Sequence, residues 1–202
     1  SECAVISEGY SKIGLNFLSE LDGMFAICLY DKNNHLVHLS RDYFGQKPLY
    51  YNSKISSDGS TSIYASTSLK TVSILSGEEL RPEFVAEWID LGFTIAPHTI
   101  YNNVYKVAPG ETVTISTKTG KIYRSYQPQR LSSNFRAKST TQGSINKSAS
   151  LLCNSISEDI KSTLTHGDVK SALMLSKGID SSVIEILAAP HISNSIDVIS
   201  MD

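Results

Sequence analysis

The sequence has few cysteines, no long apolar run and almost no excess of charge of either sign. Its three cysteines, Cys3, Cys28 and Cys153, form no Cys-x-x-Cys pair, which argues against a zinc site and a disulfide framework. No apolar stretch approaches the roughly 20 residues of a membrane-spanning helix. A formal net charge of −2 gives no bulk attraction to nucleic acid. We therefore expect a cytoplasmic protein with no membrane and no nucleic-acid partner. Its 41% hydrophobic residues suit a folded core.

Both ends of the sequence lack the features of a complete protein. The chain starts at Ser1 without methionine or a signal peptide, and apolar residues at helical spacing follow at once. It stops at Asp202, directly after an apolar stretch over 196–201 that predicts a strand. One strand–helix–strand unit cannot cover both faces of an open α/β sheet. We expect an internal fragment of a longer chain.

Hydrophobic patterning predicts helices and hairpins over the first two thirds of the chain. The predicted elements are a helix over 1–21, a hairpin of 24–30 with 35–40, a helix over 82–91, and a hairpin of 113–116 with 121–126. Trp88, the only tryptophan, falls on the apolar face of its helix and is expected in the core. Cys28 and His38 fall on the first hairpin, where we expect core or surface residues rather than a catalytic pair.

A polar stretch divides the chain. Residues 127–148 are rich in Ser, Thr, Gln and Asn, which predicts an interdomain linker. After it, residues 145–164 have the apolar spacing of an amphipathic helix, and a strand is expected over 172–175. We therefore divide the chain into a domain over 1–127, a linker over 128–144 and the beginning of a second domain over 145–202.

The loop 176–180 follows that strand and precedes a predicted helix. A tight polar loop at a helix start directs free backbone N–H groups at an anion. Gly178 permits close approach of the backbone, and Asp180 has the oxygen ligands that Mg²⁺ prefers. The hydroxyl donors of this segment are those of Ser176, Ser181 and Ser182. A phosphate-binding loop and an ordinary strand–helix turn both fit these residues.

Several blocks of the sequence, taken in order, resemble glutamine-hydrolysing asparagine synthetases. The blocks are 21–27 (Leu-Asp-Gly-Met-Phe-Ala-Ile), 41–51 (Arg-Asp-Tyr-Phe-Gly-Gln-Lys-Pro-Leu-Tyr-Tyr), 64–66, 91–101 and 107–110. The loop after them resembles the Ser-Gly-Gly-x-Asp-Ser loop of ATP pyrophosphatases, which split ATP between its α and β phosphates. The resemblance covers essentially the whole chain. It departs from the family at Lys177, where the family has Gly, and at Thr67, where the family has Glu.

The resemblance implies two domains and two linked reactions. The fold it implies is α+β, a partial αββα layer of the N-terminal-nucleophile hydrolase fold, followed by the start of an α/β, Rossmann-like ATP-pyrophosphatase domain. In the family, a glutaminase releases ammonia from glutamine. A synthetase activates the aspartate side chain as an adenylate, which ammonia then converts to the amide. The implied substrates and cofactors are glutamine, aspartate, ATP and Mg²⁺, and the resemblance leaves a homodimer open.

The resemblance also assigns roles to individual residues. Glu2 stands where the family's Asp binds the α-amino group of glutamine. The nucleophilic cysteine of the family lies outside the chain, so we expect no catalytic residue within it, and neither Ser1 nor Cys3 takes that role. The implied ATP-binding residues are Met174, Ser176, Lys177, Gly178, Asp180, Ser181, Ser182 and Met201, with Asp180 also the Mg²⁺ ligand.

Other functions remain open at this point. Lys177 and Thr67 favour a non-catalytic, degenerate copy. A relative that amidates another carboxylate or forms a β-lactam has the same loop. A tRNA-modifying pyrophosphatase also uses it, but predicts basic stripes and often Cys-x-x-Cys pairs, which this sequence lacks. For the chain alone, we expect no glutaminase activity and weak or no binding of Mg-ATP.

Overall fold

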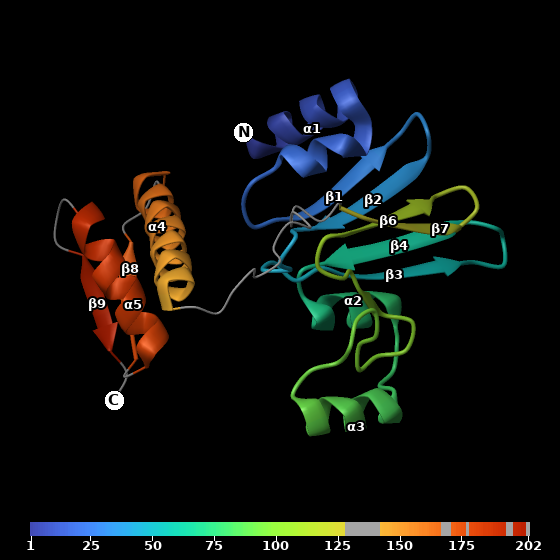
Figure 1. Cartoon of the computed structure of the whole chain (residues 1–202). Coiled ribbons are helices and arrows are strands. Elements are labelled where there is room, and N and C mark those ends of the chain that lie inside the picture. Colours follow the sequence, from blue (N-terminus) through green and yellow to red (C-terminus); the bar gives the residue numbers. More distant parts are fainter. Residues whose placement is uncertain (128–141, 167–170, 177, 193–195, 201–202) are drawn as a thin grey trace. The chain divides into compact units, whose positions relative to one another are not determined.

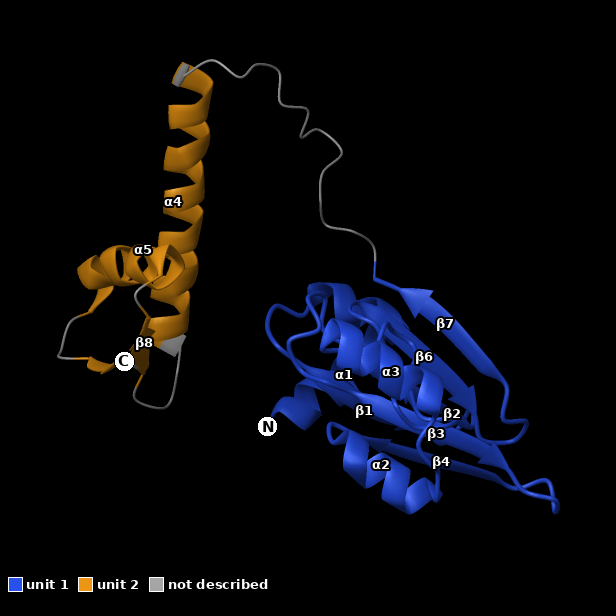
Figure 2. Cartoon of the chain, turned by 90° about the horizontal axis from the view of Figure 1, so that it is seen from below, with its two compact units in different colours: residues 1–131 blue, residues 132–202 orange. Residues whose placement is uncertain are grey.

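The computed structural model describes residues 1–127, 142–166, 171–176, 178–192 and 196–200. The chain forms two compact units, unit 1 over Ser1–Leu131 and unit 2 over Ser132–Asp202 (Figure 2). Each unit is described by itself. Among the described residues, no helix combines the length and apolarity needed to cross a membrane.

Unit 1 has a four-stranded antiparallel sheet in the order β1-β2-β6-β7. Its strands are β1 (Ala26–Asp31), β2 (Leu36–Arg41), β6 (Glu111–Ser116) and β7 (Ile122–Tyr126). The β1–β2 turn is held by Asp31, whose Oδ1 accepts a hydrogen bond from the Asn34 backbone N–H at 3.0 Å. Both predicted hairpins are confirmed, since β1 pairs with β2 and β6 with β7.

A second antiparallel sheet, in the order β4-β3-β5, packs against the first. Its strands are β3 (Tyr50–Ile55), β4 (Thr61–Ser66) and β5 (Tyr105–Lys106). Side chains from both sheets form one buried cluster of Leu39, Leu49, Tyr51, Val107, Val113 and Ile115. Removing this much apolar surface from water is the main favourable term in folding.

Four helical segments accompany the sheets in the described part of unit 1. They are α1 (Glu2–Ile13), the 3₁₀ helix η1 (Gly14–Glu20), α2 (Leu69–Ser76) and α3 (Pro82–Leu91). Helix α1 lies beside the first sheet and α2 beside the second (Figure 1), so the layers run helix, sheet, sheet, helix. This mixed α/β arrangement with antiparallel sheets is consistent with the expected N-terminal-nucleophile type of domain.

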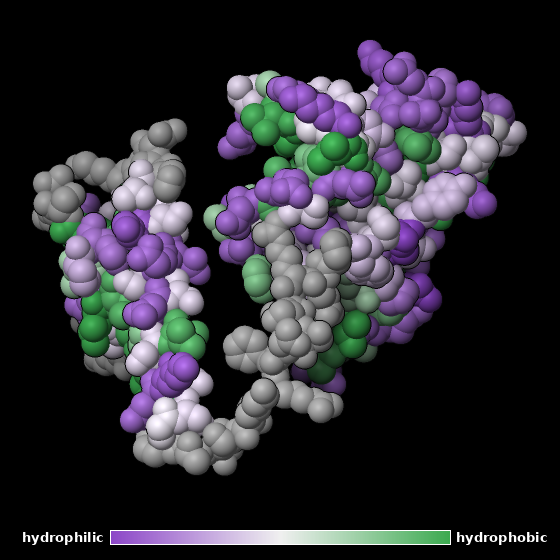
Figure 3. All heavy atoms as spheres, turned by 45° about the horizontal axis from the view of Figure 1, so that its top comes forward, coloured by the Kyte–Doolittle hydropathy of each residue, from purple (hydrophilic) through white to green (hydrophobic). Residues whose placement is uncertain are grey.

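The expectation for Trp88 is wrong. The helix over 82–91 is confirmed as α3, but Trp88 is 51% exposed and Ile89 is 72% exposed. No residue of α3 is buried by the described part of the chain. Helical spacing identified the apolar face, but spacing says nothing about whether another element covers it. Figure 3 shows hydrophobic residues (green) at the surface of unit 1 among hydrophilic ones.

Unit 2 begins with a long helix and continues as a strand–helix–strand unit. Its elements are α4 (Gln142–His166), β8 (Ala172–Leu175), α5 (Ile179–Ala188), the 3₁₀ helix η2 (Ala189–His191) and β9 (Asp197–Ser200). Strands β8 and β9 are parallel, with Met174 opposite Ile199. Helix α4 begins three residues before the expected start at 145, so part of the predicted linker is helical. The rest of that linker lies outside the described residues.

Candidate functional site

The loop after β8 is closed by serine hydroxyls. Ser181 Oγ donates to the carbonyl oxygen of Ser176 at 2.9 Å, and the Ser176 backbone N–H donates to Ser181 Oγ at 3.2 Å. Ser182 Oγ lies 3.0 Å from the carbonyl oxygen of Gly178 and donates to it. These bonds tie the end of the strand to the start of α5. The two hydroxyls therefore shape the loop in this structure.

The N-terminus of α5 carries no side-chain cap from the described residues. Gly178 is the N-cap and has extended backbone angles, φ −88° and ψ 157°. It does not need positive φ, but a Cβ there would lie 3.1 Å from Ser176 Oγ, tighter than normal packing allows. The first N–H groups of a helix have no partner within the helix, and they favour anions. The geometry therefore presents, at the carboxyl end of β8, a helix N-terminus that no described side chain caps.

Asp180 lies in the first turn of this helix and is exposed. Among the described residues, no group of three or more His, Cys, Asp or Glu side chains is placed to hold a metal ion. A single carboxylate fits Mg²⁺ that is bound largely by water and nucleotide phosphates. Asp180 is thus chemically suited to that role only when a phosphate ligand is present.

The remaining ATP-site predictions are only partly placed. Met174 lies on β8 and is 63% exposed, so it is not a buried core methionine within the described residues. Lys177 and Met201 lie outside the described residues. The structure therefore brings together Ser176, Gly178 and the first turn of α5, next to the strand that carries Met174.

Glu2 lies at the other candidate site, in unit 1. It is exposed in the first turn of α1. It lines a groove of about 1070 Å³ between α1 and the β1 strand. Cys3 and Cys28 also line this groove, together with Tyr10 and Asp31. The groove is large enough for an amino acid such as glutamine.

Hydrogen bonds made by Arg41 and Asp42 hold the turn over 41–51 in its conformation. Arg41 donates from Nε to the carbonyl oxygen of Lys47 at 2.7 Å and from Nη1 to that of Val107 at 2.9 Å. Asp42 accepts the backbone N–H groups of Gln46 at 2.9 Å and Lys47 at 3.0 Å. Burial raises the pKa of Asp42, but these backbone donors outweigh it and hold that pKa below its ordinary value.

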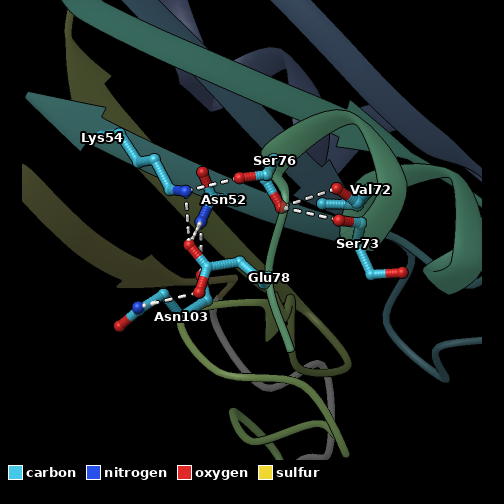
Figure 4. Close-up of polar contacts among 7 residues, drawn as sticks. All are labelled: Asn52, Lys54, Val72, Ser73, Ser76, Glu78 and Asn103. Carbon is cyan, nitrogen blue, oxygen red and sulfur yellow. Dashed lines mark hydrogen bonds and ion pairs between the residues drawn. The ribbon is translucent and has the colours of Figure 1, made fainter. Parts of the chain in front are cut away.

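A second polar network joins β3 to the segment after α2 (Figure 4). Lys54 Nζ lies 2.7 Å from Glu78 Oε1, and Asn103 Nδ2 donates to Glu78 Oε2 at 3.0 Å. Asn52 is fully buried and donates to the carbonyl oxygen of Asn103 at 3.0 Å. These contacts fix the connection between α2 and α3 on the sheet, and we assign the network a structural role.

Sequence reasoning missed a third cluster, which borders the groove. Tyr10 Oη donates to Asp31 Oδ2 at 2.8 Å and lies 3.1 Å from His38 Nε2. His38 Nδ1 lies 2.9 Å from Thr114 Oγ1. Burial, with help from Asp31, raises the pKa of Tyr10 to about 12. The Asn34 side chain, its backbone N–H and Tyr10 lower the pKa of Asp31 to about 2. We call Tyr10, Asp31, His38 and Thr114 the Tyr10 cluster.

Comparison with known proteins gives a family for unit 1. A family model described as a glutamine amidotransferase domain matches residues 1–127. The chain is 30% identical over 129 residues to putative asparagine synthetase (glutamine-hydrolyzing) 2 of Methanocaldococcus jannaschii, which covers 62% of this chain and 24% of that protein. It is 28% identical over 190 residues to asparagine synthetase (glutamine-hydrolyzing) 1 of Bacillus subtilis, covering 93% of this chain and 28% of that protein.

A fungal protein shows the same degree of similarity. Amidase chyE of Penicillium rubens is 28% identical over 194 residues, covering 94% of this chain and 26% of that protein. The chain thus spans about a quarter of the length of the curated relatives it matches. The chain belongs to the glutamine amidotransferase domain family, in the group that contains the glutamine-hydrolysing asparagine synthetases.

Proposed function

We propose that the natural protein containing this sequence transfers ammonia from glutamine to a carboxylate that ATP has activated, with aspartate as the acceptor. The observation that carries this proposal is the N-terminus of α5, which no described side chain caps, at the end of a parallel strand. It lies on the same chain as an amidotransferase domain. A helix N-terminus of this kind suits the phosphate groups of a nucleotide.

In the proposed glutaminase step, unit 1 binds glutamine rather than cleaving it by itself. The Glu2 carboxylate is a suitable partner for the α-amino group, because a charged donor and a charged acceptor form strong hydrogen bonds. Glu2 lines a groove with room for the rest of the substrate. The proposal assigns the nucleophile to no residue between 1 and 202.

In the proposed synthetase step, a carboxylate oxygen of aspartate forms a bond to the α-phosphorus of ATP. The bond from that phosphorus to the β-phosphate oxygen breaks, and pyrophosphate leaves. Ammonia then attacks the acyl carbon, AMP departs with the bonding electrons, and the nitrogen loses a proton. The first N–H groups of α5 and the hydroxyl of Ser176 stabilise the charge that builds up on pyrophosphate. Mg²⁺ would be held by Asp180 together with the phosphates, and it supplies Lewis-acid charge neutralisation.

The test is a pair of Asp→Asn variants in the natural protein, assayed for pyrophosphate and asparagine formation from glutamine, aspartate and Mg-ATP. Asp180→Asn should lower kcat/KM for ATP by at least about tenfold, because it removes a ligand from a charged site. Asp197→Asn is the matched control. Asp197 is also exposed but starts β9, at the opposite end of the parallel pair from the loop. Equal activity of the wild type and Asp180→Asn would contradict the nucleotide role.

The acceptor is the part of the proposal that needs a separate test. The similarity to a fungal protein named as an amidase, at the same identity as a bacterial asparagine synthetase, favours testing carboxylates other than aspartate. A panel of carboxylic acids should be assayed for acceptor-dependent release of pyrophosphate. If pyrophosphate were released with another acid but not with aspartate, that acid would be the acceptor. The proposed activation by ATP and transfer of ammonia would stay the same.

A further inference from the structure

Helix α1 has little apolar packing to hold it in place. The described residues bury none of its side chains. Ile6 and Tyr10 pack against the small buried cluster of Phe17, Leu18 and Ile27. Beyond these contacts, a groove of about 1070 Å³ lies between α1 and β1. Polar contacts from α1 to the sheet therefore matter more than they would for a helix with a buried face.

The Tyr10 cluster supplies those contacts, and its hydrogen bonds fix the tautomer of His38. The single hydroxyl proton of Tyr10 goes to Asp31. His38 Nε2 must therefore carry a proton and donate it to Tyr10 Oη, 3.1 Å away. In a neutral ring, Nδ1 is then an acceptor, and it takes the hydroxyl proton of Thr114 at 2.9 Å. His38 lies directly opposite Thr114 in the β2–β6 pair, so the sheet itself orients the ring.

We propose that His38 is a positioning residue that holds α1, and with it Glu2, at a fixed place along the groove. Thr114 orients the ring, the ring donates to Tyr10, and Tyr10 fixes the middle of the helix. Glu2 lies eight residues before Tyr10, a distance of about 12 Å along the helix. A small change in the tilt of α1 about Tyr10 would therefore displace Glu2 along the groove. The role of Glu2 in glutamine binding rests on the proposed function, whereas the hold on α1 does not.

The first measurement is hydrogen exchange of the α1 backbone amides in the full chain. Tyr10→Phe removes both hydrogen bonds of the hydroxyl, and Thr114→Val removes the group that orients the ring. The loss of one hydrogen bond should speed exchange in α1 by about three- to tenfold, so Thr114→Val should fall within this range and Tyr10→Phe at or above its upper end. His38→Leu should do the same, whereas His38→Gln should restore much of the protection, because its amide nitrogen reaches the position of Nε2.

The matched control is Lys12→Ala, also on α1. Lys12 forms an ion pair with Glu8, one turn before it on the same helix, and its side chain is 70% exposed. This variant should leave exchange in the rest of α1 unchanged. If Lys12→Ala and Tyr10→Phe gave equal effects, or if Gln and Leu at position 38 behaved alike, the positioning role would be overturned. Near-UV circular dichroism identifies any variant that fails to fold.

The second measurement is glutaminase kinetics in the natural protein. Tyr10→Phe and Thr114→Val should raise KM for glutamine about three- to tenfold with little change in kcat, because they displace a binding group rather than a reacting one. A fall in kcat at constant KM would contradict the link to Glu2. If the wild-type protein hydrolyses no glutamine, the proposed function fails, while the exchange experiment still decides whether the cluster holds α1.

Discussion

At the scale of single residues, His38 makes the stability of the fold depend on pH. Burial lowers the pKa of His38 below its ordinary value near 6.5, and the Asp31 carboxylate offsets this only in part. Below about pH 6.5 the unfolded chain therefore binds more protons at this position than the folded chain, so stability rises with pH across that window. The free energy of unfolding in urea should fall from about pH 7 to about pH 5. His38→Gln should flatten this decline, and an unchanged slope would contradict it.

Glu111 is the other residue for which burial sets a clear expectation. Its side chain is fully buried, with Oε1 2.7 Å from Arg124 Nη1 and Oε2 accepting the Ala108 backbone N–H at 2.7 Å. Glu111→Gln removes the counter-charge of Arg124, whose side chain is about a third exposed. We expect a loss of about 2–4 kcal/mol in the free energy of unfolding, somewhat less than for a fully buried pair.

The control for Glu111 is the same substitution in an exposed pair. Glu83 lies 2.6 Å from Arg81, but both side chains are largely exposed. Water and salt screen such a pair, so Glu83→Gln should change stability little. Similar losses for the two variants, measured by urea denaturation, would show that burial does not determine the contribution of Glu111.

At the scale of elements, the turn over 41–51 depends on Gly45. Its φ is +65°, and a Cβ would lie 2.8 Å from Pro109 Cγ and 3.0 Å from Arg41 Cζ. Gly45→Ala should cost about 1–2 kcal/mol from the backbone alone, with a further loss from displacing Arg41. Gly59→Ala is the control, because Gly59 has φ +82° but a Cβ there would have no described atom within 4 Å. If the two variants lost the same free energy of unfolding in urea denaturation, the contacts of a Cβ at position 45 with Pro109 and Arg41 would contribute nothing.

Local patterns predicted some elements and missed others. The hairpin of β1 and β2 and the helix α3 are confirmed, because apolar residues there follow the period of the element. The apolar patterns do not predict β3, β4 or α2. Strand β3 contains Asn52 and Lys54, whose partners Glu78 and Asn103 come from far along the chain. Polar residues whose hydrogen-bond partners come together only in the folded state interrupt the alternation of apolar and polar residues that predicts a strand.

The candidate sites also differ in whether neighbouring or distant residues in the sequence build them. The loop before α5 is built from neighbours in the sequence, and the strand, loop and helix expected there are present. Its ATP role stays a prediction. The hydrogen bonds of the Tyr10 cluster join residues 21, 28 and 76 positions apart. The β1–β2 hairpin places Asp31 near His38, but Thr114 reaches His38 only through the pairing of β2 with β6, and Tyr10 only through the packing of α1 on the sheet.

At the scale of the whole molecule, the two units differ in how much they bury. The buried clusters of unit 1 include side chains from both of its sheets. Among the described residues of unit 2, only Ala188 is buried. Parallel strands are usually covered on both faces, whereas β9 is exposed along its whole length. Unit 2 should therefore be the less stable of the two.

The aromatic residues allow the two units to be followed separately during unfolding. All ten tyrosines and the single tryptophan lie within residues 1–127, so the near-UV circular dichroism of tyrosine and tryptophan reports on unit 1. The far-UV helical signal includes α4, a helix of 25 residues in unit 2. In a urea titration, part of the far-UV signal should be lost before the near-UV signal changes, because unit 2 is the less stable unit. A single two-state transition would instead make the two curves coincide.

Ala188→Asp places a charge at the buried position of unit 2. It should move only the early loss of far-UV signal to lower urea concentration. Coincident curves, or a shift of the near-UV transition in this variant, would show that the two units unfold as one.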